Sequence, residues 1–231
     1  MHVCRRWRSV VFGLPCSLNL QLVYSSGTPA RDMLDVWPAL PLVLLCDSAY
    51  PIDNIVAVFE HSNRVRQIEL LEVSTSSLEK TLAATQVPFP ELTDLVLMSY
   101  EETARVLPDS FLGGSAPSLR RLWLNGVPFP GLPKLLLSAA HLVGLILWRI
   151  PHSGYFSPED MLTAPSTLTS LQHLWLEFKS PRSCPNWAGR RPPSPARVVL
   201  PVLKHFSFKG LANTWTTLWP TSMPLDSSTC T

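Results

Sequence analysis

One six-residue pattern recurs along the chain and constrains its fold more than any other feature. The pattern reads leucine, two residues, leucine, one residue, leucine, with Val, Ile or Phe in place of leucine in some copies. The starts of its six clear copies are 27, 27, 23, 29 and 32 residues apart. Two weaker copies precede these, at residues 18–22 and 40–45. The six clear copies are residues 65–70, 92–97, 119–124, 142–147, 171–176 and 203–208.

The spacing of the leucines predicts a short strand in each copy. The last two leucines are two residues apart, so their side chains point to the same face of a strand. One such unit cannot bury its own apolar face, whereas a stack of units can. This signature, with a period of roughly 20–29 residues, is typical of leucine-rich repeats. We therefore predict an α/β fold: a leucine-rich-repeat solenoid with a concave parallel sheet, convex helices and irregular turns, and irregular repeats of about 23–32 residues.

The segments between the copies carry helix signals. Apolar residues with helical spacing predict a helix over residues 53–61, and the leucines of residues 130–141 predict another. Residues 76–79 form a capping box ahead of further apolar residues. Residues 157–160 combine an N-cap serine, a proline and two acids, which is a strong helix start. We expect these helices on the convex side of the sheet.

Proline is abundant, at 23 of 231 residues, about twice the usual ~5%. Many of these prolines lie in links just before or after a predicted strand, where a fixed φ prevents a helix from continuing. In residues 181–201, prolines instead mix with arginines and no acidic residue is present. We predict that this segment is an exposed loop inserted between repeats. The alternative is a basic or polyproline docking segment.

Charge, hydropathy and cysteine content exclude several classes of protein. The formal net charge of +2 comes from 19 basic and 17 acidic residues, which argues against a nucleic-acid partner. No apolar stretch approaches the ~18 residues of a membrane span, so no membrane partner is expected. The five cysteines are scattered and form no CxxC pair. They indicate free thiols and a protein of the cytoplasm or nucleus.

No catalytic motif is present, so the sequence predicts a protein that is not an enzyme. The chain contains no GxGxxG, GxxxxGK[ST], HExxH or GxSxG pattern. We expect no catalytic residue, no cofactor and no metal site. His173 and His205 occupy the same position of their copies and are predicted to be neighbours. A solvated pair is the main interpretation of these two histidines, and a metal-binding pair is the alternative.

The residue between the last two leucines of each copy is predicted to point away from the core, onto the concave face. Large apolar side chains occupy this position in three consecutive copies. Such a stripe with basic neighbours suits a protein ligand, whereas the alternative is that a loop such as residues 181–201 covers it. The candidate partner-binding residues are Glu69, Arg120, Arg121, Trp123, Ile146, Trp175 and His173.

The sequence VCRRWRSVVFGLP at residues 3–15 resembles the end of an F-box, whose last helix reads V-C-K/R-x-W. Together with the repeats, it is similar to the F-box and leucine-rich-repeat proteins that are abundant in mushroom-forming fungi. The resemblance covers residues 3–210. It implies a substrate receptor of a cullin–RING ubiquitin ligase, in which a protein substrate binds the concave face. It also implies that a Skp-type adaptor binds the residues that match the F-box helix, namely Val3, Cys4, Arg6, Trp7 and Val11.

These observations divide the chain into three parts. Residues 1–15 are the remnant of an F-box of about forty residues, so we expect a chain truncated within that motif. The alternative role for this remnant is a helix that caps the solenoid. Residues 16–210 form the solenoid, and residues 211–231 resemble no repeat. We expect an aberrant or disordered tail there, produced by a frameshift or a misplaced intron. A structural interaction scaffold or a non-functional truncated paralogue is the alternative to a substrate receptor.

Overall fold

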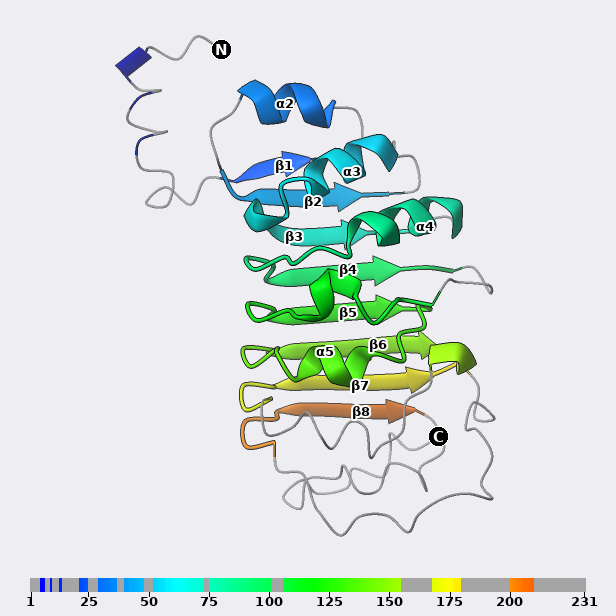
Figure 1. The fold of residues 1–231 in the computed structure, drawn as a ribbon. Coiled ribbons are helices and arrows are strands. Elements are labelled where there is room, and N and C mark those ends of the chain that lie inside the picture. The colour runs from blue at the N-terminus through cyan, green and yellow to red at the C-terminus, as the bar shows by residue number, and fades with distance from the viewer. Residues whose placement is uncertain are drawn as a thin grey trace.

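A computed structural model describes residues 5, 6, 9, 13, 21–24, 29–36, 40–47, 52–72, 75–100, 106–154, 168–179 and 200–209 of the chain. These residues build an α/β fold around one open sheet of eight strands (Figure 1). All the strand pairs are parallel, and the order of the strands in the sheet is their order in the chain. Each strand therefore pairs only with the strands before and after it in the sequence.

The strands lie where the leucine pattern predicts them. Each of the six clear copies overlaps one strand, so the predicted parallel sheet is confirmed. The weaker copy at residues 40–45 overlaps β2, whereas the one at residues 18–22 meets β1 only at Leu22. The strands are β1 (Leu22–Tyr24), β2 (Leu42–Cys46), β3 (Val65–Leu70), β4 (Asp94–Met98), β5 (Arg121–Asn125), β6 (Gly144–Ile150), β7 (His173–Phe178) and β8 (His205–Lys209).

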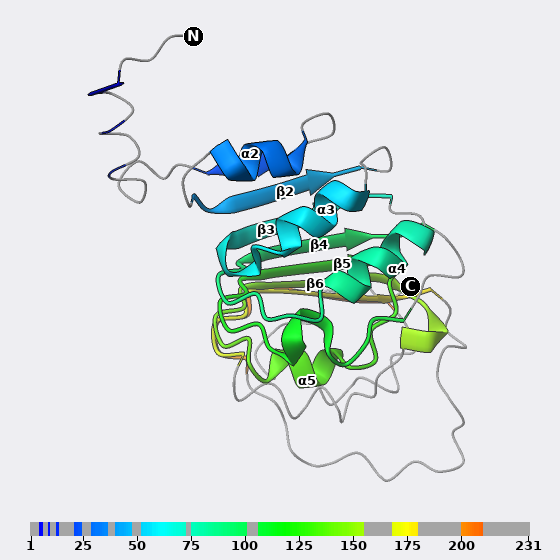
Figure 2. The ribbon, with the colours of Figure 1, turned by 45° about the horizontal axis from the view of Figure 1, so that its top comes forward.

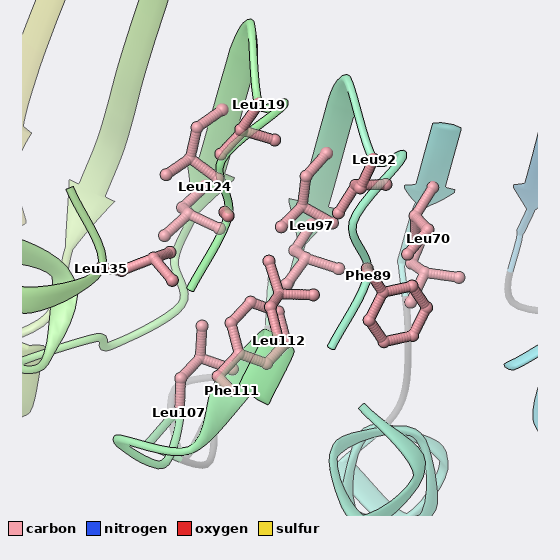
Figure 3. Packing of buried hydrophobic residues seen from close by; sticks show 14 of the residues in the cluster. Leu70, Phe89, Leu92, Leu97, Leu107, Phe111, Leu112, Leu119, Leu124 and Leu135 are labelled. Carbon is pink, nitrogen blue, oxygen red and sulfur yellow. The ribbon is translucent and has the colours of Figure 1, made fainter. Parts of the chain in front are cut away.

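The pairing register places equivalent leucines side by side. Leu122 of β5 pairs with Leu95 on one side and with Leu145 on the other. These side chains and the leucines two positions further along each strand are buried, and they form one continuous core. Figure 3 shows Leu97 and Leu124 within this core, beside Leu112 from the segment that connects their strands. The alternation of the last two leucines therefore sets which face of the sheet is buried.

The turn that leads into each strand repeats from copy to copy. The first leucine of the copy donates its backbone N–H to the carbonyl oxygen three residues earlier, as Leu92 does to Phe89 at 3.2 Å. That earlier residue is buried before β4 to β8 and half-buried at Ser62 before β3, so it marks a core position that the leucine pattern does not reveal. The second residue of each copy donates its backbone N–H to the carbonyl oxygen of the second residue in the preceding copy. The nitrogen–oxygen distance is 2.8 Å in all five of these bonds, 93→66, 120→93, 143→120, 172→143 and 204→172.

The helices lie together on one face of the sheet (Figure 2). They are α2 (Ala30–Val36), α3 (Ile52–Phe59), α4 (Thr75–Ala84) and α5 (Leu132–Leu136), joined by the 3₁₀ turns η1 (Ser62–Arg64), η2 (Phe111–Gly114) and η3 (His152–Gly154). The helices predicted around residues 53–61 and 76–79 are confirmed as α3 and α4. Within the described residues, no helix has the length and apolar character needed to cross a membrane.

The helix predicted over residues 130–141 is shorter than expected. Only Leu132–Leu136 are helical, and turns follow. The N–H groups of Leu137 and Ser138 bond to carbonyls three residues back, which tightens the chain out of α-helical geometry. The Ser138 hydroxyl also donates to the carbonyl of Leu135 and accepts the N–H of Ala116, each at 2.8 Å. These bonds anchor the turn to the preceding segment instead of extending the helix.

Several predictions concern residues outside the described part of the chain. Of the F-box-like segment, only Arg5, Arg6, Ser9 and Gly13 are described, and all are helical and exposed. Val3, Cys4, Trp7 and Val11 lie outside the described residues, as do the helix start at 157–160 and the tail at 211–231. Of residues 181–201 only the last two are described. Leu200 is buried and belongs to the turn that leads into β8.

Candidate protein-binding face

One face of the sheet lies opposite the helices, and we call it the open face. The residues between the core leucines point to this face. The helices α2, α3, α4 and α5 lie on the other face (Figure 2). The pairing register places Val96, Trp123, Ile146, Trp175 and Ser207 in one row across β4 to β8. The predicted order of Trp123, Ile146 and Trp175 on consecutive strands is therefore confirmed.

Exposure along the row is greatest at Trp175 on β7. Trp175 is 46% exposed, whereas Val96, Trp123 and Ile146 are half-buried. At the other end of the row, the half-buried Glu69 pairs in register with Val96. The apolar part of the row therefore spans four strands and is bounded by an acidic residue at β3 and by Ser207 at β8.

The predicted polar residues lie along the N-terminal ends of the strands. Arg121 on β5 is exposed and forms an ion pair with Asp94 on β4. Arg120 precedes β5 and is exposed. The exposed His173 stacks on His205 of β8, with ring centroids 4.9 Å apart and ring planes 9° from parallel. The histidines are neighbours as predicted. No group of three potential metal ligands occurs among the described residues.

The C-terminal ends of the strands add aromatic residues that the sequence analysis missed. Trp148 is 39% exposed and pairs in register with Asn125 of β5. Tyr100, after β4, is 52% exposed, and the guanidinium carbon of Arg149 lies 6.0 Å from its ring centroid. This distance suits a cation–π contact. Trp148, Arg149 and Tyr100 lie outside the six-residue copies, so the leucine pattern gives no signal for them.

Two polar groups on β5 are buried without a hydrogen-bond partner. Asn125 is 1% exposed, and neither its amide nitrogen nor its amide oxygen has a partner. The indole nitrogen of Trp123, two residues earlier on the same strand, is also buried and unpartnered. Alternation along the strand places both side chains on the open face. Buried polar groups in folded proteins are nearly always satisfied, so this pair needs an explanation.

The two titratable groups with shifted pKa values among the described residues lie in the core, away from the open face. Burial raises the pKa of the Cys46 thiol to about 12, and the neighbouring charge of Asp47 adds to the effect. Burial also raises the pKa of Tyr24, against a smaller lowering by Arg64. A buried thiol of this kind stays protonated at neutral pH and is a poor nucleophile. Cys46 therefore behaves as a core side chain.

The row and its surroundings offer large apolar side chains, cations at the strand ends, and unsatisfied amide and indole groups. These are the residue types that dominate protein interfaces. Searches of protein-family models, curated proteins and solved structures found no match to this chain.

Proposed function

We propose that the chain is a leucine-rich-repeat solenoid that works as a protein-binding module, and that it serves as an F-box-type substrate receptor of a cullin–RING ubiquitin ligase. The observation that carries the binding role is the apolar row on the open face. Trp123, Ile146 and Trp175 lie side by side in this row, and Trp148 lies on the same strand as Ile146. Exposed aromatic patches with basic neighbours mark protein interaction sites.

Three features support the solenoid. Strand order follows chain order, the strands β3 to β8 are preceded by the same hydrogen-bonded turn, and the starts of these strands recur at the period of the leucine pattern. Units that contact only their neighbours are the defining property of solenoid proteins. The connecting segments change from the helices α3 and α4 to the shorter α5 and 3₁₀ turns, which suits a repeat with irregular convex sides.

The receptor role rests on the resemblance of residues 3–15 to an F-box helix, together with the repeats that follow. In this proposal Val3, Cys4, Arg6, Trp7 and Val11 contact a Skp-type adaptor, while the open face holds the protein substrate. Arg6 is exposed and helical, so its side chain is accessible to a partner. The ligase partners supply the catalytic activity, and the chain needs no cofactor. Such a receptor works in the cytoplasm or nucleus.

Two variants with matched exposure test the binding face. Trp175→Ala removes a side chain that is 46% exposed on the open face, and Leu137→Ala removes one that is 47% exposed after α5 on the helix side. Proteins that cross-link to the wild-type chain in cells should be lost with Trp175→Ala and retained with Leu137→Ala. Equal recovery with both variants, at unchanged melting temperature, would rule out the open face as the binding site.

The adaptor contact is tested with purified components. The full chain mixed with a purified Skp-type adaptor should elute as a complex in size-exclusion chromatography. Arg6→Glu should weaken this complex, whereas Arg31→Glu, at an exposed position of α2, should not. Absence of a complex at micromolar concentrations would remove the receptor role. It would leave the alternative, a structural interaction scaffold without a link to ubiquitin.

A further inference from the structure

The unpartnered groups of Asn125 and Trp123 indicate what kind of partner the open face takes. We infer that the face binds a polypeptide segment in extended conformation, whose backbone peptide groups pair with the carboxamide of Asn125 and the indole N–H of Trp123. This inference deepens the proposed function and rests on it. It names the chemistry of the partner at the contact, which neither the apolar row nor the resemblance to an F-box protein specifies.

The position of Asn125 places its amide at the centre of the contact. On the open face it pairs in register with Met98 of β4 on one side and with Trp148 of β6 on the other. Trp123 precedes it on the same face of the same strand. These three side chains are all longer than that of asparagine, so the amide lies beneath them, in agreement with its 1% exposure.

The hydrogen-bonding capacity of the two groups matches a peptide backbone. A carboxamide carries both donors and an acceptor, so it can accept a backbone N–H and donate to a backbone C=O at the same time. An indole N–H only donates and therefore needs a carbonyl. The two residues are two positions apart on β5, about 6.6–6.8 Å along the strand. The peptide groups along one edge of an extended chain repeat at this same spacing, so one segment can satisfy both side chains.

Access to the amide requires the side chain of Trp148 to move, and its surroundings favour such movement. The pairing of β6 with β7 is irregular between Leu147 and Ile150, the segment that contains Trp148. Arg149 within this segment has a positive φ of 52°, which is uncommon for a residue other than glycine. Trp148 thus precedes a residue with an unusual backbone conformation, and it lies where the pairing of β6 with β7 is interrupted. A bound segment that displaces the Trp148 ring can form two hydrogen bonds with the Asn125 carboxamide and one with the Trp123 indole N–H.

Single-stranded nucleic acid is the other polymer that stacks on aromatic rows, and the charges favour a polypeptide. Nucleic-acid binding depends on cations that neutralise phosphates. On this face Arg121 is paired with Asp94, and Lys209 with Glu177 at a nitrogen–oxygen distance of 3.2 Å. Neutralised cations contribute little to phosphate binding, whereas the unsatisfied amide and indole groups remain available to peptide groups.

The test uses the full chain and defined peptides. A phage-displayed library of random 12-residue peptides is selected against the wild-type chain, and enriched peptides are synthesised. Asn125→Leu, which keeps the branching of the side chain and removes its polar atoms, should weaken their binding at least 10-fold in fluorescence anisotropy. Leu137→Ala should leave it unchanged. To test the backbone pairing without changing the protein, each peptide is also made with single amide groups replaced by esters. Esters on one edge should weaken binding by about 3- to 10-fold, and those on the other edge should not.

The outcomes separate the inference from the proposed function. Peptides that lose binding with Trp175→Ala, but tolerate Asn125→Leu and every ester, would leave the open face as the binding site and overturn the backbone pairing. Enriched peptides that tolerate both Trp175→Ala and Asn125→Leu would also remove the proposed binding face. No enriched peptide, or displacement of the peptides by a single-stranded oligonucleotide at comparable affinity, would overturn the inference as well.

Discussion

Replacing Asn125 by leucine should stabilise the free protein. Asn125 is a fully buried side chain whose amide nitrogen and oxygen have no hydrogen-bond partner. Leaving a buried polar group unsatisfied costs about 1–3 kcal/mol, and leucine has the same number and branching of non-hydrogen side-chain atoms without that cost. Leucine also suits a strand between Met98 and Trp148 better than asparagine does. We expect the free energy of unfolding to rise by about 1–3 kcal/mol.

Urea denaturation followed by tryptophan fluorescence measures this change. The midpoint should rise while the slope of the transition stays constant, as for a change in stability alone. The melting temperature should rise by roughly 2–4 °C for each kcal/mol in a chain of this size. Asn54→Leu is the control, because the Asn54 side-chain oxygen accepts a hydrogen bond from the Ala30 N–H at 3.3 Å. That variant should be less stable than wild type or equal to it.

A loss of stability in Asn125→Leu as large as that in Asn54→Leu would refute the reasoning, since it would mean that the Asn125 amide is hydrogen-bonded in the free protein. The expected gain, combined with the expected loss of peptide binding, is informative in another way. A substitution that damages the fold lowers stability and binding together. Opposite signs for the two measurements identify a residue retained at a cost in stability for its role in recognition.

Three further predictions concern other described residues. Tyr24→Phe removes a buried hydroxyl without a partner, so the free energy of unfolding should stay constant or rise by up to about 1 kcal/mol; a clear fall in urea denaturation would contradict this. Gly126→Ala should lower the free energy of unfolding by about 1–3 kcal/mol, because Gly126 has a φ of +67° and an added Cβ would lie 2.2 Å from the Ser99 carbonyl oxygen. Gly144→Ala is the control and should leave the free energy of unfolding nearly unchanged in urea denaturation, because the nearest atom to its added Cβ is 3.9 Å away. The thiol of Cys46, with its pKa raised to about 12, should resist iodoacetamide at pH 8 until urea unfolds the chain. The unfolded chain loses this proton first, so Cys46 should lower stability as pH rises from about 9 toward 12, and Cys46→Ala should lack this part of the decline.

The strand positions could be predicted because one physical requirement determines them. A leucine pair with a period of two must face the core, and this fixes both the strand and its buried face, as for Leu122 and Leu124 of β5. The row through Trp123 follows directly from the same alternation. The residue three positions before each copy escaped notice, because Phe89 and Ala116 differ too much in size to form a visible pattern.

Asn125 was missed for a different reason. An asparagine at a strand end is ordinarily exposed to solvent, and its burial here depends on the sizes of Met98 and Trp148 on the neighbouring strands. Those residues lie 27 and 23 positions away in the sequence. The residues near Asn125 in the sequence do not indicate that Met98 and Trp148 lie beside it. The same limit applies to the contact between Arg149 and Tyr100, which joins segments that follow β4 and β6.

The match between strand order and chain order has a consequence for how such a surface can change. Every strand pairs only with its sequence neighbours, so removing or duplicating one whole unit breaks a single junction and leaves the other pairings intact. Each such event shortens or lengthens the open face by one strand spacing, about 4.8 Å. The reach of the surface can therefore be altered by genetic duplication or by protein engineering, separately from the side chains that determine what it recognises.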